Sequence, residues 1–186
     1  TPTRRGDAGT RSLNFALQAA LNPPKPGKQE RRFGELVFRE GDRVMQTRND
    51  YDVIWQKEDG TAGTGIFNGD VGKIARIDPS GELLEIVFDD RTATYTSDML
   101  AELDMAYAMT VHKAQGSEYR GVVFVGAPCA PSLMVRGVLY TAITRARELL
   151  VIVGDDSAVS KMAENDRRSR RYSGLKWRLR KGGAEK

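Results

Sequence analysis

The sequence contains a single cysteine, Cys129, and a single histidine, His112. A disulfide needs two cysteines and a structural zinc site needs several cysteines and histidines, so this composition excludes both. No run of 18 apolar residues is present, which excludes a membrane-spanning helix. The charged residues of Thr1–Arg5 have no apolar segment behind them, so they do not form a secretory signal. We therefore expect a cytoplasmic protein with no membrane partner and no metal site.

Charge is distributed unevenly along the 186 residues. Residues 33–103 carry fifteen acidic and seven basic side chains, whereas residues 1–32 carry seven basic and two acidic ones. Residues 161–186 carry ten basic and three acidic side chains. An acidic middle between basic ends favours separate modules whose ends face an anionic partner, although a solvated basic tail would give the same pattern. The apolar fraction of 40% is enough to form a hydrophobic core.

The first predicted element is a helix that begins at Gly9-Thr10 and ends at Asn22-Pro23-Pro24, because consecutive prolines cannot continue it. Its apolar residues recur at helical spacing, while Asn14 and Gln18 lie on the other side. Residues 24–30 follow as a linker that contains two prolines, a glycine and two lysines. The apolar residues of the helix are Leu13, Leu17, Ala20 and Leu21.

Residues 31–102 have a different pattern, in which short strand-like stretches are separated by turn signals such as Asn68-Gly69 and Pro79-Ser80-Gly81. Short strands at this spacing predict a small antiparallel barrel, and a length of roughly seventy residues suits an SH3-like one. The strands that we expect are Arg43–Gln46, Val71–Ile77, Leu83–Phe88 and Thr92–Tyr95.

After residue 103 the pattern returns to helices and apolar strands. A helix is predicted over Met105–Gln115, and a second helical stripe runs between Val135 and Ala146. Gly121–Ala127 and Leu149–Val153 are continuous apolar runs, typical of strands in a parallel sheet covered on both faces. We therefore predict a discontinuous α/β domain, an all-β insert and a basic tail. Their bounds are 1–30 with 103–160 for the α/β domain, 31–102 for the insert and 161–186 for the tail.

The predicted α/β domain is short of strands and of a phosphate-binding loop. Two clear core strands are fewer than the usual number, so we expect a domain that is incomplete at its N-terminus and belongs to a larger protein. A Walker A loop needs Gly, four residues and then Gly-Lys-Ser/Thr. Gly27-Lys28 and Gly72-Lys73 lack both the earlier glycine and the following hydroxyl residue. A phosphate cradle and magnesium ligands would therefore have to come from outside this chain.

Two segments are more polar than an α/β core requires. Residues 110–118, Thr-Val-His-Lys-Ala-Gln-Gly-Ser-Glu, gather a hydroxyl, an imidazole, an ammonium, an amide and a carboxylate around a glycine. Residues 138–147 contain Thr141 and Arg145, which are four apart and would share one face of a helix. These segments resemble motifs V and VI of superfamily 1 DNA helicases, in particular of the RecD-like branch. The resemblance continues in collinear order through Arg4–Gly9, Gly41–Gln46, Phe67–Gly72 and Arg171–Leu175.

The resemblance implies that the α/β domain is the second RecA-like motor domain of a helicase, with an SH3-like insertion. Arg145 matches the arginine finger of motif VI, which stabilises the charge on the transferred phosphoryl group. Gly116, Glu118 and Thr144 match positions on the nucleotide side of the two motifs. The planar fork of an arginine suits this task better than a lysine would.

The resemblance also implies contacts to the backbone of single-stranded DNA, where hydrogen bonds to phosphate position the strand. The matching residues are Thr110, His112 and Lys113 in motif V and Asn68 in the insert. Two of these have simpler explanations, because Asn68-Gly69 is a hairpin-turn signal and a lone histidine on a helix is commonly a packed structural residue. Their roles in DNA binding therefore depend on the resemblance.

The implied function is that of the C-terminal part of an ATP-dependent DNA helicase of the RecD-like, exodeoxyribonuclease V alpha-subunit type, with roles in DNA repair and recombination. ATP and Mg²⁺ would be bound in the full-length protein with the N-terminal RecA-like domain of the same parent, and the fragment alone would be inactive. Single-stranded DNA is the expected partner, and nuclease subunits are a further partner left open. Two alternatives also stay open: the helicase portion of a conjugative relaxase, and a stand-alone nucleic-acid-binding module without ATPase activity.

Overall fold

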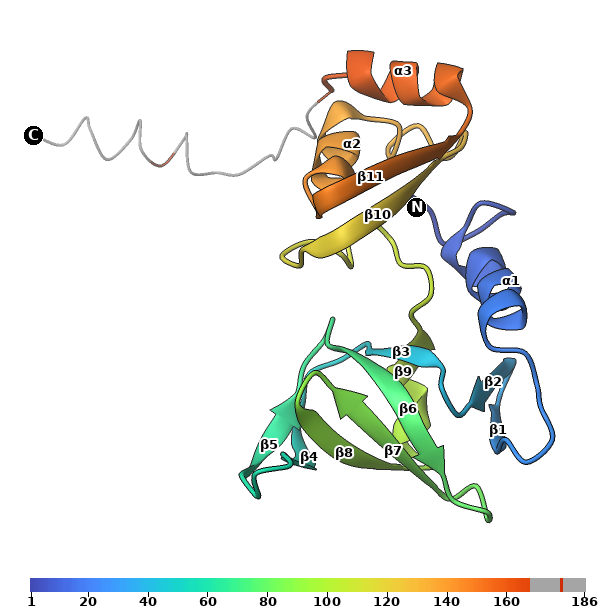
Figure 1. Cartoon of the computed structure of the whole chain (residues 1–186). Helices are drawn as coiled ribbons and strands as arrows, with labels where there is room; N and C mark the ends of the chain where they lie inside the picture. Colours follow the sequence, from blue (N-terminus) through green and yellow to red (C-terminus); the bar gives the residue numbers. More distant parts are fainter. Residues whose placement is uncertain (168–177, 179–186) are drawn as a thin grey trace, which may run out of the picture.

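The computed structural model describes residues 1–167 and residue 178, and it consists of two lobes (Figure 1). None of the helices in this described part is long and apolar enough to cross a membrane. The elements are α1 (Thr10–Leu21), β1 (Glu30–Phe33), β2 (Leu36–Arg39), β3 (Arg43–Gln46), β4 (Asp50–Gln56), β5 (Ala62–Ile66), β6 (Val71–Ile77), β7 (Leu83–Phe88), β8 (Arg91–Thr96), the 3₁₀ helix η1 (Met99–Glu102), β9 (Leu103–Met105), β10 (Tyr119–Gly126), α2 (Arg136–Ile143), β11 (Ala146–Gly154) and α3 (Asp156–Glu164).

One lobe is the predicted antiparallel barrel, the lower lobe of Figure 1. Seven strands form a sheet in the order β5-β4-β8-β7-β6-β3-β9, and the sheet curls around a single hydrophobic core. Along β7 the side chains of Leu84, Ile86 and Phe88 are fully buried while Glu85 and Val87 between them are more exposed, which is the two-residue period of a half-buried strand. β3, β6 and β7 have the predicted bounds, and β8 is one residue longer at each end.

The sequence pattern does not predict β4 and β5. β4 contains Asp50 and Asp52, and β5 contains Gly63 and Gly65, residue types that are depleted in strands. Tertiary packing explains the glycine in the middle of β5. Gly63 lies opposite Trp55, and a Cβ at Gly63 would lie only 2.5 Å from the indole ring. The missing side chain therefore makes room for the ring, and the strand forms despite its low intrinsic preference.

The other lobe contains the predicted parallel sheet, which confirms the α/β fold class. β10 and β11 pair in parallel from Gly121↔Leu149 to Gly126↔Gly154, and α2 and α3 pack against them. The core of this lobe includes Phe124, which is 1% exposed. β11 has a single strand neighbour in the described part of the chain, and its apolar residues Leu149–Val153 are 37–60% exposed.

The α/β lobe extends past its predicted end at residue 160. Helix α3 continues to Glu164, because Met162 is fully buried in the core of the lobe. The first four residues of the predicted tail are therefore helical. Residues 168–177 and 179–186 of that tail, with the motif Arg171–Leu175, lie outside the described residues.

Helix α1 has the predicted bounds but turns its polar side inward. Asn14, Gln18 and Asn22 recur every four residues on one face and are 7–8% exposed. In contrast, Phe15 and Leu21 are 78% and 68% exposed. The face of α1 that is buried most deeply is therefore the polar one, while Leu13 and Leu17 of the apolar side are half-buried. The physical reason is that α1 faces polar groups, which need hydrogen-bond partners when they are buried.

Residues 105–115 do not form the predicted helix, and the same polar packing explains why. Met105 ends β9, whose backbone pairs with β3. The side chain of Asn14 donates to the carbonyl oxygens of Met105 (3.0 Å) and Ala108 (2.9 Å) and accepts from Ala108 N (2.7 Å). A helix would need these backbone groups for its own i→i+4 hydrogen bonds. The segment is a loop because its backbone is already bonded elsewhere.

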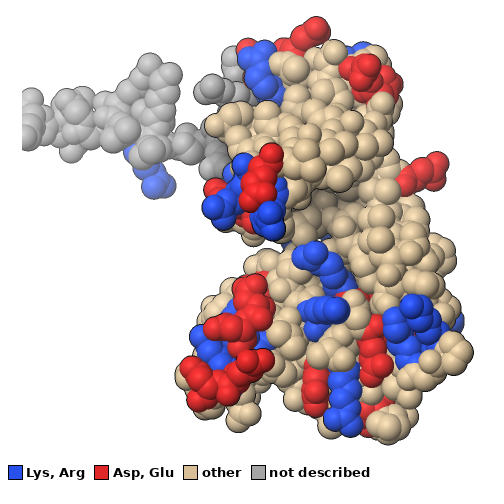
Figure 2. Space-filling model, in the orientation of Figure 1, with Lys and Arg blue, Asp and Glu red and all other residues tan. Residues whose placement is uncertain are grey.

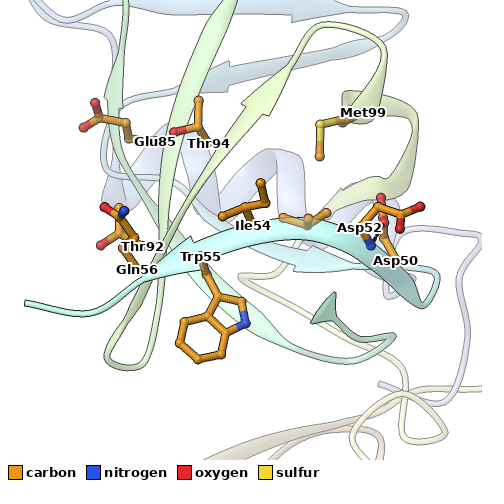
Figure 3. Close-up of a pocket in the computed structure, with 10 residues that line it drawn as sticks. Asp50, Asp52, Ile54, Trp55, Gln56, Glu85, Thr92, Thr94 and Met99 are labelled. Carbon is orange, nitrogen blue, oxygen red and sulfur yellow. Dashed lines mark hydrogen bonds between the residues drawn. The ribbon is translucent and has the colours of Figure 1, made fainter. Parts of the chain in front are cut away.

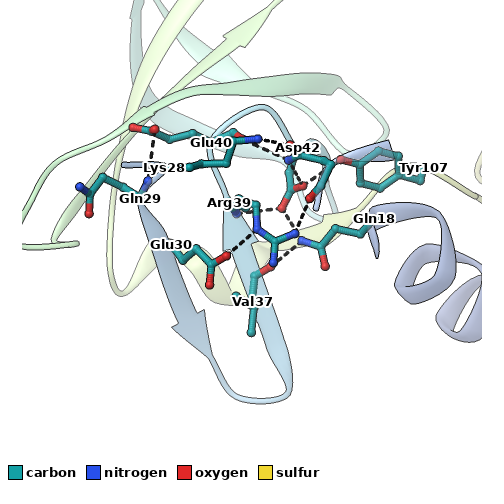
Figure 4. Close-up of polar contacts among 10 residues, drawn as sticks. Gln18, Lys28, Gln29, Glu30, Val37, Arg39, Glu40, Asp42 and Tyr107 are labelled. Atoms are coloured by element: carbon teal, nitrogen blue, oxygen red, sulfur yellow. Dashed lines mark hydrogen bonds and ion pairs between the residues drawn. The ribbon is translucent and has the colours of Figure 1, made fainter. Parts of the chain in front are cut away.

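The carboxylate of Asp42, which is fully buried just before β3, connects α1 to the end of β2 and to the segment after β9 (Figure 4). Gln18 Nε2 donates to Oδ2 at 2.6 Å and Asn22 Nδ2 donates to Oδ1 at 2.7 Å. Tyr107 Oη donates to Oδ1 at 2.8 Å, and Arg39 N donates to Oδ2 at 2.8 Å. Burial and the hydrogen bond to Asp42 raise the pKa of Tyr107 to about 12, so the phenol remains a donor. One carboxylate thus binds the segments before and after the barrel.

We expect Asp42→Ala to lower the free energy of unfolding by roughly 2–4 kcal/mol, because several buried donors lose their acceptor at once. Urea unfolding of the 186-residue chain, followed by circular dichroism, measures this loss. Asp52→Ala is the matched control, since Asp52 is an exposed aspartate on β4 and its removal should change stability by less than about 0.5 kcal/mol. Equal losses in the two variants would contradict the role of Asp42.

Candidate functional site

Residues 110–118, which include most of the predicted site, form a compact loop between β9 and β10. Val111 and Ala114 are buried, and Val111 packs in the core of the α/β lobe, which fixes the loop to that lobe. Thr110 begins the turn, since its carbonyl oxygen accepts from Ala114 N (3.0 Å) and its Oγ1 accepts from Lys113 N (3.2 Å). The polar side chains between the buried residues are therefore held at the surface of the lobe.

One end of this loop contacts the barrel. Lys113 Nζ donates to Asn68 Oδ1 at 2.6 Å, although the two residues are 45 positions apart. His112 is exposed and Thr110 is half-buried. The structure thus brings together the four residues predicted to contact DNA, at the junction of the lobes. Figure 2 shows Lys and Arg side chains in the hollow between the lobes.

Asn68 lies in a hydrogen-bonded turn between β5 and β6; these strands are not neighbours in the sheet, so the turn forms as predicted but the hairpin does not. Asp70 N donates to Phe67 O (2.9 Å), and Gly69 has a φ of 102°, the left-handed conformation that the third residue of a type II turn requires. Asn68 N donates to Asn49 Oδ1 (3.0 Å), and Phe67 N donates to Asp70 Oδ2 (3.1 Å). The backbone of the turn is bonded on both sides, so the Asn68 side chain projects from a fixed position.

The other end of the loop contacts Arg145, which follows α2. Its NH1 donates to Ser117 O (3.0 Å), its Nε to Thr141 O (3.0 Å) and its NH2 to Thr144 Oγ1 (3.1 Å). Tyr119 N donates in turn to Arg145 O at 2.8 Å. Arg145 lies just beyond the helix rather than within it, yet it reaches the Thr141 backbone as the four-residue spacing suggests. The guanidinium is held between the two polar segments.

The residues predicted to face the nucleotide gather around this guanidinium. The Thr144 hydroxyl is bonded to it, and Gly116 and Glu118 flank the Ser117 carbonyl. Gly116 has a φ of 93°, a conformation that glycine adopts without strain. The Glu118 carboxylate pairs with Arg147 Nε at 3.8 Å, and both side chains are more than 60% exposed. We call this group the Arg145 corner; it consists of Gly116, Ser117, Glu118, Thr144 and Arg145.

The chemistry of the Arg145 corner fits an anion. A guanidinium carries five N–H donors, and three of them donate to residues in the described part of the chain. Two donors are left for a ligand, in the fork geometry that matches a phosphate. A divalent cation does not fit this donor set. Within the described residues, no group of three His, Cys, Asp or Glu side chains could hold a metal ion.

A hollow of about 690 Å³ on the barrel has the opposite character. It lies between β4 and β8, and Asp50, Asp52 and Glu85 line it together with Ile54 (Figure 3). None of the predicted site residues lines it. Three carboxylates repel a phosphate group, so this hollow does not suit a nucleotide or a DNA backbone.

Reasoning from the sequence missed the residues that hold the site in place. Asn14 fixes the start of the segment that leads into the loop, and Tyr107 fixes it to Asp42. A signal for α1 was present in the sequence, since three amide side chains recur every four residues. The sequence contains no pattern that predicts the contact of Lys113 with Asn68, because the two residues belong to separate elements of different lobes.

Two family models match the chain. A model described as the ATP-dependent RecD-like DNA helicase SH3 domain matches residues 13–88, which contain α1 from Leu13 on and the barrel as far as β7. A model described as the UvrD-like helicase C-terminal domain matches residues 105–153. The second match contains the loop 110–118 and the whole Arg145 corner.

Curated relatives match over most of this chain and over a small part of their own length. The ATP-dependent RecD2 DNA helicase of Deinococcus radiodurans is 36% identical over 170 residues, which are 91% of this chain and 22% of that protein. The RecBCD enzyme subunit RecD of Mycolicibacterium smegmatis is 31% identical over 180 residues, which are 97% of this chain and 28% of that protein. The chain therefore spans less than a third of these relatives.

Solved structures share the fold. Bacteroides Pif1 bound to single-stranded DNA has a TM-score of 0.53 and 18% identity, over 96% of this chain and 44% of that one. A structure of two coordinating Pif1 helicases at forked double-stranded DNA has a TM-score of 0.52 and 18% identity, over 95% of this chain and 43% of that one. At this identity the likeness concerns the fold, and it agrees with a RecA-like α/β lobe that carries an inserted barrel.

Proposed function

Since this chain belongs to the RecD-like helicases and corresponds to their C-terminal region, we propose that it is the second motor domain of an ATP-dependent DNA helicase. In this role it contributes an arginine finger to the ATP site and part of the track for single-stranded DNA. The finger residue is Arg145, with Gly116, Glu118 and Thr144 on the nucleotide side. The track consists of Thr110, His112, Lys113 and Asn68.

The observation that carries this proposal is the anchoring of Arg145. Three of its N–H groups bind residues of the two motifs, and two stay available to a ligand in the described structure. In the transfer of a γ-phosphoryl group, charge spreads over three oxygens, and an arginine from the facing domain stabilises it. A guanidinium that is already fixed needs little reorganisation to act in this way.

We expect a complete binding site for ATP and Mg²⁺ in the full-length parent and only part of that site in this chain. The Arg145 corner suits a phosphate, but the sequence holds no Walker A loop to cradle the triphosphate. When bound, Mg²⁺ would neutralise the charge that develops on the transferred phosphoryl group. We infer that an N-terminal RecA-like domain of the same parent holds both, and that this chain closes the site from the opposite side.

The DNA track follows from the group at the junction of the lobes. The hydroxyl of Thr110, the imidazole of His112 and the ammonium of Lys113 are hydrogen-bonding groups that bind phosphate oxygens, and Asn68 adds an amide from the barrel. Because these groups contact the backbone rather than base edges, the binding they provide is independent of sequence. Such binding suits an enzyme that moves along DNA.

The wider setting of the parent is also part of this proposal. We expect a cytoplasmic enzyme of DNA repair and recombination, and the RecD relatives that are named as RecBCD subunits favour nuclease subunits as partners. A conjugative relaxase would instead carry a relaxase histidine cluster and a catalytic tyrosine upstream of the motor. A stand-alone binding module would have no need of a guanidinium held beside motif V.

The 186-residue chain alone is expected to show no ATP hydrolysis, with or without single-stranded DNA. The reason is that half of an ATP site lacks both the phosphate cradle and the magnesium ligands. A phosphate-release assay on the purified chain tests this. DNA-stimulated turnover in that assay, abolished by Arg145→Ala, would show that the chain holds a complete site.

In the full-length parent, Arg145→Ala should lower kcat by roughly 10³-fold while nucleotide affinity changes much less, because the group acts on charge that develops in the transition state. Steady-state ATPase assays with saturating single-stranded DNA, together with nucleotide-binding titrations, separate the two effects. Arg120→Ala is the control, since Arg120 is an exposed arginine on β10 that pairs with Glu148. If the kcat of the Arg145→Ala variant is within about threefold of the parent's, the role of Arg145 is structural rather than catalytic.

The chain alone should bind single-stranded DNA weakly and with a steep salt dependence. Each neutralised phosphate contributes about −0.7 to the slope of log K against log salt, so Lys113→Gln should flatten the slope by about that amount. Thr110→Ala and His112→Ala should each weaken binding by roughly 0.5–1.5 kcal/mol, the worth of a typical hydrogen bond. Fluorescence anisotropy at several salt concentrations measures both quantities. Arg76→Gln, on the exposed side of β6, is the control for a change of charge alone.

If Lys113→Gln and Arg76→Gln change the slope equally, the contact is diffuse and the loop 110–118 is not the track. Deletion of residues 168–186 tests the basic tail in the same assay, since it removes eight basic side chains and one acidic side chain and leaves α3 with its buried Met162 intact. We expect it to flatten the slope as well. An unchanged slope would make the tail a solvated end.

A further inference from the structure

An exposed pair of aromatic rings lies beside the turn that carries Asn68. Tyr51 of β4 and Phe67 at the start of the turn have ring centroids 5.5 Å apart at an angle of 70°, an edge-to-face arrangement. Tyr51 is 66% exposed and Phe67 is 40% exposed. Large aromatic side chains are mostly buried or paired with a partner. A pair that is packed together yet left open to solvent is therefore a candidate for binding a ligand.

The backbone fixes the position of the pair. Gly65 has a φ of 97°, and a Cβ at that position would lie 2.9 Å from Phe67 Cζ, so the ring of Phe67 folds back over a bare stretch of β5. Phe67 N and O are both bonded to Asp70 within the turn. Two χ angles per ring leave little entropy to lose when a planar ligand stacks on such a surface.

The pair borders the proposed DNA track. Phe67 precedes Asn68, whose side chain accepts from Lys113 Nζ at 2.6 Å. A nucleotide whose phosphate binds Lys113 or its neighbours would therefore have its base within reach of the rings. Figure 1 shows the turn between β5 and β6 rising from the barrel toward the α/β lobe, and Phe67 is the first residue of that turn.

The aromatic residues Phe38, Phe88, Tyr95 and Trp55 of the insert have other roles, and Phe33, 36% exposed, belongs to the separate sheet of β1 and β2. Phe38, Phe88 and Tyr95 are fully buried in the core. Trp55 packs on Gly63, and the cations of Lys57 and Arg91 lie 6.0 and 5.9 Å from its ring centroid. Tyr51 and Phe67 have neither of these explanations in the described structure.

The negative charge beside Tyr51 and Phe67 favours a DNA base, rather than the phosphate backbone, as the ligand of these rings. Asp50 and Asp52 flank Tyr51 along β4, and like charge keeps phosphates away from them. A base is uncharged and presents a π-face to an aromatic ring. Stacking of bases on aromatic side chains tolerates any sequence, because every base has such a face. The phosphate thus belongs at Lys113 and the base at the rings.

We propose that Tyr51 and Phe67 form a stacking platform for a base of single-stranded DNA. This inference rests on the proposed function, since it assumes that the strand passes along Thr110, His112 and Lys113. The barrel then binds DNA through an apolar contact at one end, although its overall charge is negative. The binding energy from this contact depends little on salt, in contrast to that from Lys113.

The test compares an oligothymidylate of about twelve nucleotides, within the span that such modules cover, with an abasic strand of equal length and charge. The wild-type chain should bind the thymidylate roughly tenfold more tightly than the abasic strand. Tyr51→Ala and Phe67→Ala should each remove most of that preference while affinity for the abasic strand and the salt slope stay unchanged. Tyr51→Phe should keep the preference. Ile54→Ala is the matched control, because Ile54 is also 66% exposed on β4 and has no ring.

Three outcomes would overturn the platform. Equal binding of both strands by the wild type would do so while leaving the track intact. An equal loss for both strands in Tyr51→Ala would indicate a structural effect, and circular dichroism of the variant would confirm it. Binding of neither strand would remove the proposed track in this chain, and the platform with it. Photo-crosslinking of 5-iodouracil within the oligonucleotide gives a second readout, with Tyr51 or Phe67 expected as the site of attachment.

Discussion

The architecture depends on one buried carboxylate. A module inserted into a domain needs two chain crossings, here before β1 and after β9, and the host stays intact only if both crossings are held. Asp42 binds Gln18 and Asn22 from the segment before the barrel and Tyr107 from the segment after it. A buried charge is tolerated only with hydrogen-bond partners. The carboxylate therefore requires the amide face of α1, and that helix leaves apolar residues in solvent as a consequence.

This requirement marks the limit of what the sequence predicts about the fold. Strands with a clear two-residue period, such as Val71–Ile77 and Leu83–Phe88, have their predicted bounds because one face of each is buried in the barrel core. Periodicity predicted helix α1 correctly but not which of its faces is buried, and it failed for residues 105–115, where polar tertiary contacts prevent a helix. It also failed for β5, whose Gly63 is explained by the position of Trp55. Such contacts leave no regular trace in a single sequence.

In the candidate site, too, contacts between residues close in sequence were predictable and contacts between distant segments were not. Residues close in sequence, such as Thr110 and Lys113 or Thr141 and Arg145, were predicted together because a loop or helix end keeps them together. The contacts between segments were not predicted: Arg145 reaches Ser117 across 28 positions, and Lys113 reaches Asn68 across 45. Family resemblance named these residues individually. The structure adds that both contacts belong to one nine-residue loop.

That loop has a mechanical consequence under the proposed function. Val111 anchors it in the core of the α/β lobe, while Lys113 binds the barrel and the Ser117 carbonyl accepts from Arg145. If Arg145 is the finger and Lys113 the phosphate contact, as we propose, only the backbone of residues 113–117 separates the Arg145 contact from Lys113. In the proposed track, the charged contact to phosphate is Lys113 of the α/β lobe, and the acidic barrel contributes the uncharged side chains of Asn68, Tyr51 and Phe67. A strand held partly by stacking and partly by ionic contacts can be released at one without losing the other, which is what stepwise movement along DNA requires.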